Sequence, residues 1–130
     1  MATGYKEMLE AARAEIDNLA ADKACLMQGD EDIMFVDLRD IRELGREGKI
    51  PGAFHAPRGM LEFWIDPSSP YHKDIFASGK HLIFYCASGW RSALAAKTAQ
   101  DMGVSHVSHI DGGFTAWKDA GGPVEIQDKT

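Results

Sequence analysis

The chain is predicted to fold as one α/β domain built around a mainly parallel sheet. Three short, mostly apolar runs indicate buried strands, at residues 33–38, 81–85 and 106–110. Each run is followed by a segment with helix signals, so strands and helices alternate along the chain. The 130 residues are 45% hydrophobic, which suffices for one core, and we therefore treat residues 1–130 as a single domain.

The N-terminal segment, residues 1–27, is predicted to be helical. Apolar residues recur at three- and four-residue steps from Tyr5 to Ala20, which is the pattern of one helical stripe. Such a stripe could dock a partner or form a dimer, but packing on its own domain is favoured. The polar stretch Gln28–Asp32 is then a turn that leads into the core, residues 33–123.

Between the first two strands the sequence predicts short elements. Asp40 is a suitable cap for a helix over residues 41–47, and Gly48 is a suitable end for it. The proline-containing stretch Ile50–Pro57 is expected to form an extended edge segment or a turn, because proline cannot donate to a central ladder. Another short helix is expected over Arg58–Trp64.

The second and third strands are each followed by a clearer helix. The Ala-rich segment Arg91–Met102 follows the second strand, and Gly103 is a stop signal for it. After the third strand, Asp111-Gly112-Gly113 turns the chain, and Phe114–Ala120 is predicted to form the last helix.

A cysteine lies where the second strand ends and its helix begins. Functional loops of parallel sheets lie at this end of the strands, and a helix N-terminus offers free N–H groups and a positive dipole that favour a thiolate. Gly89 permits positive φ, so successive N–H groups can turn inward as an anion nest, to which Arg91 and Ser92 add donors. The alternative, an inert core cysteine, is disfavoured. We predict that Cys86 is the nucleophile and that a loop binds substrate and anion through Ala87, Ser88, Gly89, Trp90, Arg91 and Ser92.

Four separated motifs stand in order along the chain: Val36-Asp37-Leu38-Arg39, Gly48–Ala53, Tyr85–Ser92, and Asp111-Gly112-Gly113 with Trp117 and Gly122-Pro123. With these motifs the chain resembles a single-domain rhodanese of the thiosulfate sulfurtransferase type. The resemblance implies a rhodanese-like fold, in which helices flank a central, mainly parallel sheet on both faces. Lys49 stands where the family usually has histidine, which is expected to change local hydrogen bonding rather than catalysis.

The resemblance also implies an activity. Cys86 would take sulfane sulfur from thiosulfate or a persulfide donor, carry it as a persulfide, and pass it to cyanide or a thiol. No metal and no organic cofactor are expected. Asp37 and Arg39 are expected to form a supporting pair that braces the fold beside the loop, and Trp90 is expected to face the pocket mouth.

Two other functions stay open at this point. A module with the same loop could carry sulfur or bind a partner without turnover, and a sulfur-relay protein is then a candidate partner. The third function, a small phosphatase or arsenate reductase, is disfavoured by loop length. Four residues separate Cys86 from Arg91, whereas cysteine-dependent phosphatases, including those on a rhodanese-like fold, have five. The resemblance to rhodaneses implies that the narrower ring suits the outer sulfur of a persulfide, whereas a tetrahedral phosphate or arsenate should need the wider ring.

Charge and composition limit the remaining classes. The net charge of −6 argues against nucleic acid or an anionic membrane as the main partner. No secretory signal and no apolar run of about 20 residues are visible, so a cytoplasmic protein with free thiols is expected. Cys25 is disfavoured as a second, resolving thiol, because only Lys23 lies near it as an activating neighbour. The five histidines are not expected to form a metal site.

Overall fold

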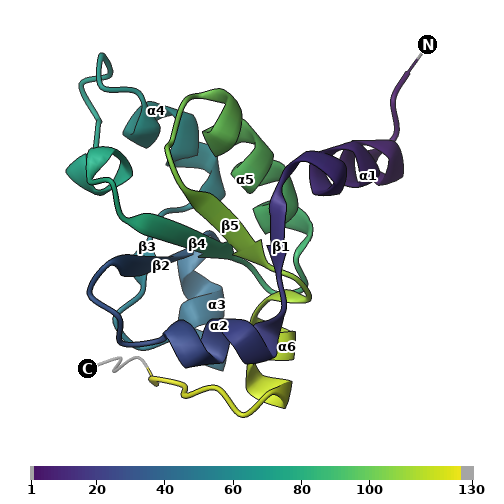
Figure 1. Ribbon diagram of the computed structural model, residues 1–130, viewed down its shortest axis with the longest axis vertical. Helices are drawn as coiled ribbons and strands as arrows, with labels where there is room; N and C mark the ends of the chain where they lie inside the picture. Colours follow the sequence, from purple (N-terminus) through teal and green to yellow (C-terminus); the bar gives the residue numbers. More distant parts are fainter. Residues whose placement is uncertain (1, 127–130) are drawn as a thin grey trace.

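The computed structural model describes residues 2–126 and is built around one five-stranded parallel sheet (Figure 1). The strand order is β1-β5-β4-β2-β3, and every pairing in the sheet is parallel. This confirms the predicted α/β class and parallel sheet. The strands are β1 (Asp17–Leu19), β2 (Ile33–Asp37), β3 (Phe54–His55), β4 (His81–Tyr85) and β5 (Val107–Ile110).

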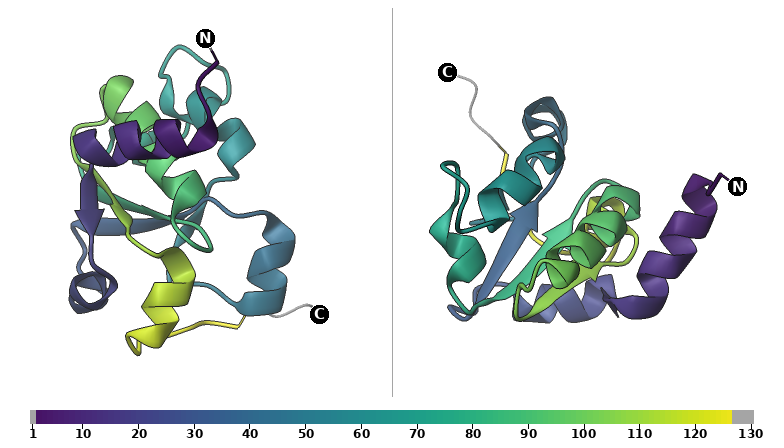
Figure 2. Two further views of the ribbon diagram at one scale, coloured as in Figure 1. Left: turned by 90° about the vertical axis from the view of Figure 1, so that its right-hand side faces the viewer. Right: turned by 90° about the horizontal axis from the view of Figure 1, so that it is seen from above.

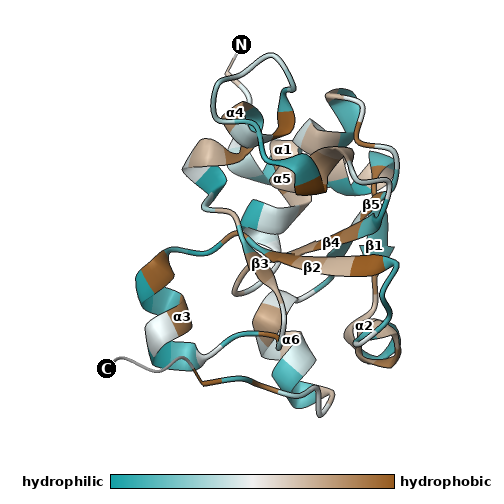
Figure 3. Ribbon diagram, turned by 90° about the vertical axis from the view of Figure 1, so that its left-hand side faces the viewer, coloured by the Kyte–Doolittle hydropathy of each residue, from teal (hydrophilic) through white to brown (hydrophobic). Residues whose placement is uncertain are grey.

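Helices cover both faces of the sheet, as expected. One face carries α4 (Leu61–Ile65) and α5 (Trp90–Asp101), and the other carries α2 (Ala21–Met27), α3 (Ile41–Glu47) and α6 (Gly113–Asp119) (Figures 1 and 3). The remaining helix, α1 (Tyr5–Glu15), packs against α5 at the margin of the domain (Figure 2). Short 3₁₀ turns, η1 (Arg58–Met60) and η2 (Asp74–Ala77), complete the connections.

The two helical layers explain why β2 and β4 are mostly apolar on both faces. Successive side chains of a strand point to opposite faces. Val36 and Phe84 are therefore buried against the α4 and α5 side, while Phe35 and Ile83 are buried against α2 and α6. Because both faces are covered, the sequence shows a continuous apolar run instead of an alternation.

The N-terminal segment differs from the prediction of one helical stripe. The helix ends at Glu15, and residues 17–19 form the edge strand β1 before a second helix begins at Ala21. In the first half of the stripe, Leu9 and Ala12 are buried and the helix contacts α5, so packing on the domain itself is confirmed for that half. The helical periodicity of the second half is overridden by pairing with β5, in which Asp17 lies opposite Ser108.

The short elements follow their local signals closely. Asp40 caps α3 in a reciprocal box with Glu43, and Gly48 ends the helix with φ of 81°. The segment after Pro57 is a 3₁₀ turn followed by α4 instead of one helix, and the turn η2 was not predicted. In the part of the chain from residue 2 to 126, no helix is long and apolar enough to cross a membrane.

Candidate functional site

The predicted loop lies at the carboxyl end of β4, a central strand between β5 and β2. Cys86 is 1% exposed, and its Sγ accepts hydrogen bonds from the backbone N–H groups of Gly89, at 3.2 Å, and Ser92, at 3.4 Å. Gly89 has φ of 96° and precedes the first residue of α5. The left-handed glycine thus turns the chain so that backbone donors converge on the sulfur.

Backbone hydrogen bonds from the start of α6 hold the backbone of this loop in place. The carbonyl oxygens of Cys86 and Ala87 accept hydrogen bonds from the N–H groups of Phe114, at 2.7 Å, and Thr115, at 3.1 Å. Gly113 makes the approach feasible, because a Cβ at this position would lie 2.6 Å from the Cys86 carbonyl oxygen. The Gly-Gly turn of the sequence therefore holds the cysteine loop in place.

Arg91 has a partner that sequence reasoning missed. Its guanidinium makes a two-pronged ion pair with the Glu43 carboxylate, at 2.8 and 3.0 Å. The hydrogen bonds raise the pKa of Arg91 and lower the pKa of Glu43. An anionic substrate that uses Arg91 must therefore compete with a carboxylate already in place. Glu43 is 48 positions away, so loop spacing gave no signal for it.

Asp37 and Arg39 form the expected pair beside the loop. Both are almost fully buried, and Arg39 donates from Nε and Nη2 to the Asp37 carboxylate at 2.9 and 2.7 Å. Arg39 also donates to the Gly48 carbonyl at 2.7 Å, and its guanidinium lies 4.5 Å from the Phe114 ring centre. The pair thus ties β2 to the end of α3 and to α6.

A buried polar connection behind Cys86 was also missed. The Ser92 hydroxyl lies 3.6 Å from the Cys86 Sγ and 2.9 Å from Nδ1 of His109, and Nε2 of His109 lies 2.8 Å from Oδ1 of Asn18. His109 is one of the five histidines that were not expected to form a metal site, and no other role was predicted for it. A histidine at an apolar strand position could have pointed to such a connection, but its partners come from α5 and β1.

The remaining residues that the sequence drew attention to are Trp90, Ser88, Cys25 and Lys49. Trp90 is half exposed, and its ring lies 5.4 Å from that of Tyr5 on α1. Ser88 is exposed. Cys25 is a free thiol, and burial and nearby Asp22 raise its pKa, which disfavours a resolving thiolate. Lys49 donates from Nζ to the Ala53 carbonyl at 3.4 Å.

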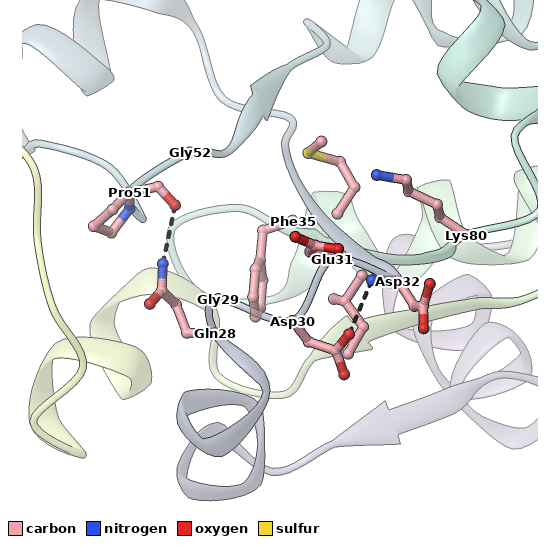
Figure 4. Close-up of a pocket in the computed structure, with 11 residues that line it drawn as sticks. Gln28, Gly29, Asp30, Glu31, Asp32, Phe35, Pro51, Gly52 and Lys80 are labelled. Atoms are coloured by element: carbon pink, nitrogen blue, oxygen red, sulfur yellow. Dashed lines mark hydrogen bonds between the residues drawn. The ribbon is translucent and has the colours of Figure 1, made fainter.

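Two hollows flank the sheet at opposite ends. One, of about 240 Å³, adjoins the loop and is lined by Ala87 and Arg39 together with side chains of α3 and α6. The other, of about 700 Å³, lies where β2 and β4 begin, between Asp30–Asp32 and Lys80 (Figure 4). Within residues 2–126, no group of three or more His, Cys, Asp or Glu side chains is arranged so that it could hold a metal ion.

Comparisons with known proteins identify the family of this chain. Residues 20–120 match the rhodanese-like domain family. A Saccharomyces cerevisiae thiosulfate:glutathione sulfurtransferase is 35% identical over 72% of this chain and 70% of its own length. A mouse thiosulfate sulfurtransferase/rhodanese-like domain-containing protein is 30% identical over 67% of this chain, which spans 59% of the relative.

Solved structures give the same fold. A Rhodopseudomonas palustris protein of unknown function, named a possible tyrosine phosphatase, is 57% identical and superposes with a TM-score of 0.93 over 96% of both chains. The polysulfide-sulfur transferase homodimer of Wolinella succinogenes is 27% identical, with a TM-score of 0.71 over 96% of this chain and 89% of its own. The family match, the motifs and the cysteine loop together show that this chain belongs to the rhodanese-like domain family.

Proposed function

We propose that the protein is a sulfurtransferase that moves sulfane sulfur from thiosulfate or a persulfide donor to a thiol or cyanide through a persulfide on Cys86. The observation that carries the proposal is the buried Sγ of Cys86, which accepts hydrogen bonds from two backbone N–H groups at the carboxyl end of β4. Such donors stabilise a sulfur anion that forms and disappears at one place. The similarity to sulfurtransferases of yeast and Allochromatium vinosum supports the transferase class.

The reaction proceeds in two displacements that balance without a metal or organic cofactor. In the first, the Cys86 thiolate attacks the outer sulfur of thiosulfate, the Sγ–S bond forms, and the S–S bond of thiosulfate breaks to release sulfite. In the second, an acceptor thiolate or cyanide attacks the outer sulfur of the persulfide and releases the Cys86 thiolate. The loop N–H groups face the sulfur anion in both steps. The absence of a cofactor, the acceptor, a relay partner and a cytoplasmic location stay predictions.

The same experiment tests this proposal and the carrier alternative. The protein is incubated with thiosulfate, its intact mass is measured, and cyanide is then added to measure thiocyanate release. We expect one added sulfur atom, lost again with cyanide, and neither event in Cys86→Ser. A persulfide that forms but never turns over favours a carrier, and no sulfur on Cys86 with any donor contradicts the proposal.

A phosphatase is the second candidate, because the 57% identical Rhodopseudomonas palustris protein was named a possible tyrosine phosphatase. Loop geometry argues against it here. The loop has four residues between Cys86 and Arg91, and the Arg91 guanidinium is paired with Glu43. The deciding measurement is hydrolysis of an aryl phosphate by wild type and Cys86→Ser. Turnover that depends on Cys86 would favour the phosphatase.

A further inference from the structure

Four polar side chains form one continuous hydrogen-bonded line from the reactive sulfur to the N-terminal segment. They are Cys86, Ser92, His109 and Asn18, linked at 3.6, 2.9 and 2.8 Å in that order. Ser92 and His109 are both 0% exposed. Because buried polar groups need hydrogen-bond partners, each member of this line depends on its neighbours.

The hydrogen bonds of Asn18 fix the direction of the whole line. Its Nδ2 donates to the carbonyl oxygens of Arg13, at 2.9 Å, and Ile16, at 3.3 Å, so its Oδ1 faces His109. An amide oxygen only accepts, and Nε2 of His109 must therefore carry a hydrogen. In a neutral ring Nδ1 is then the acceptor, to which the Ser92 hydroxyl donates. A lone pair of the Ser92 oxygen is left to face the Cys86 thiol.

Burial keeps the His109 ring neutral and opposes its protonated form, and nearby carboxylates offset only part of that effect. Burial lowers the pKa of His109 to about 4; nearby Asp111 and Asp17 favour its protonated form, and Arg13 opposes it. The ring is thus neutral near pH 7, with a lone pair on Nδ1 directed at Ser92. A thiolate formed on Cys86 would add a further negative charge that favours the imidazolium.

We propose that Ser92 and His109 form a proton relay for Cys86 and that Asn18 holds His109 in the accepting tautomer. The thiol proton passes to the Ser92 oxygen while the Ser92 hydroxyl proton passes to Nδ1 of His109. The products are a thiolate, an unchanged serine and an imidazolium, so protons and charge balance. Ser92 contacts the reacting sulfur, whereas His109 and Asn18 act through it as positioning residues.

This relay gives the N-terminal segment a role at the site. The family match begins at residue 20, so β1 and Asn18 lie outside it. Pairing of β1 with the edge of β5 places Asn18 opposite His109. The inference deepens the proposed function, but it concerns the ionisation of Cys86 and can be tested without sulfur transfer.

The experiment measures the rate of Cys86 alkylation by iodoacetamide from about pH 5 to 9, in a Cys25→Ser background. His109→Asn keeps a carbonyl oxygen that can accept from Ser92 but cannot hold a proton. We expect this variant to react at least about tenfold more slowly near pH 7 and to approach the wild-type rate near pH 9, where hydroxide removes the proton directly. A loss of packing alone would change the accessibility of the thiol at every pH, so it would not produce a deficit at pH 7 that disappears near pH 9.

Matched variants separate the relay from a loss of folding. Ser92→Ala is expected to follow the His109→Asn profile, and Ser92→Thr, which restores the hydroxyl, to return toward wild type. Ser108→Ala is the matched control on the same strand. The buried Ser108 hydroxyl bonds to His81 and Asp17 and not to the relay, so this variant should leave the profile unchanged. Asn18→Asp supplies a carboxylate to Nε2 and is expected to speed alkylation below about pH 7.

Each result decides the proposal. A His109→Asn profile parallel to wild type, or a wild-type Cys86 that iodoacetamide never modifies, overturns the relay. So does a ¹⁵N NMR spectrum that shows the hydrogen of His109 on Nδ1. The expected alkylation profile without sulfur uptake from thiosulfate would retain the relay and reject the sulfurtransferase. Sulfur uptake with the parallel profile would do the reverse.

Discussion

The two ends of the parallel sheet differ, because the larger hollow lies at one end and the reactive cysteine lies at the other. The amino ends of β2 and β4 border the larger hollow, about 700 Å³, whose rim carries Asp30, Glu31, Asp32 and Lys80 (Figure 4). The carboxyl ends border a smaller hollow of about 240 Å³ beside the cysteine loop. The larger hollow is rimmed by three exposed carboxylates and the half-buried Lys80, whereas the smaller one adjoins a buried thiol and the buried side chain of Arg39.

The carboxyl ends of the strands are the place where a reactive site can be built on this fold. At the carboxyl ends, two backbone N–H groups, a helix start and a buried polar line converge on one atom, Sγ of Cys86. At the amino ends, the groups present bond mainly within their own turn, as the Asp32 N–H does with Asp30. Convergence of donors in a dry place, rather than the volume of the hollow, distinguishes the site.

The largest expected effect comes from breaking the buried pair at the carboxyl ends. Asp37→Ala leaves the Arg39 charge buried without its carboxylate, and we expect a loss of about 3–5 kcal/mol in the free energy of unfolding. Urea titration measures the loss. Glu31→Ala, at the exposed amino end, is the matched control, with an expected loss within about 0.5 kcal/mol. Equal losses for the two variants would contradict the contrast drawn between the two ends.

Two glycines allow the carboxyl and amino ends of the sheet to be compared directly. Gly89 at the loop and Gly29 at the amino end have nearly the same φ, 96° and 92°. Either glycine changed to alanine should lose about 1–2 kcal/mol through the left-handed backbone alone. At Gly89 the new Cβ would also meet the Gly112 nitrogen at 3.1 Å, whereas nothing lies within 4 Å at Gly29.

Function therefore distinguishes the two glycine variants more than stability does. Gly89→Ala displaces an N–H donor from Sγ, and we expect sulfur uptake from thiosulfate to fall about 10²-fold. Gly29→Ala should keep the wild-type rate. Urea titration and the intact-mass assay, carried out on both proteins, measure the two effects. A Gly89→Ala protein with normal uptake would show that the backbone nest is dispensable.

The sequence predicted those parts of the molecule whose signals are local. The strands β2, β4 and β5 follow from apolar runs, α3 from its cap, and the cysteine loop from a strand that runs into a helix. Each of these signals lies within about ten residues, and neighbouring residues suffice to detect it.

The missed features all depend on partners distant in the chain. The strand β1 exists because Asp17 lies opposite Ser108, and the helical stripe that includes it could not reveal this pairing. Arg91 reaches Glu43 across 48 positions, and His109 reaches Asn18 across 91. No spacing within one element encodes such contacts, so the anion site appeared more open, and the cysteine more isolated, than the fold makes them.

The smallest change in the free energy of unfolding is expected for the ion pair between Arg91 and Glu43, and it should depend on pH. Arg91 lowers the pKa of Glu43, so the folded state favours the ionised carboxylate. This stabilisation is fully present above the ordinary pKa of a glutamate, about 4.3, and is lost as the pH falls through the lower folded value. Because the Arg91 side chain is 40% exposed, we expect at most about 1 kcal/mol at pH 7.

Glu43→Gln tests this dependence, because glutamine can still accept from the Asp40 N–H that Glu43 caps. The variant should be slightly less stable than wild type near pH 7, and the difference should close as the solution is acidified below about pH 4. Urea titration at the two pH values measures it. Since Glu43→Gln also releases Arg91 from a charged partner, the KM for thiosulfate should fall in the variant. An unchanged KM with the expected stability profile would mean that Arg91 serves the fold and that backbone donors alone hold the anion.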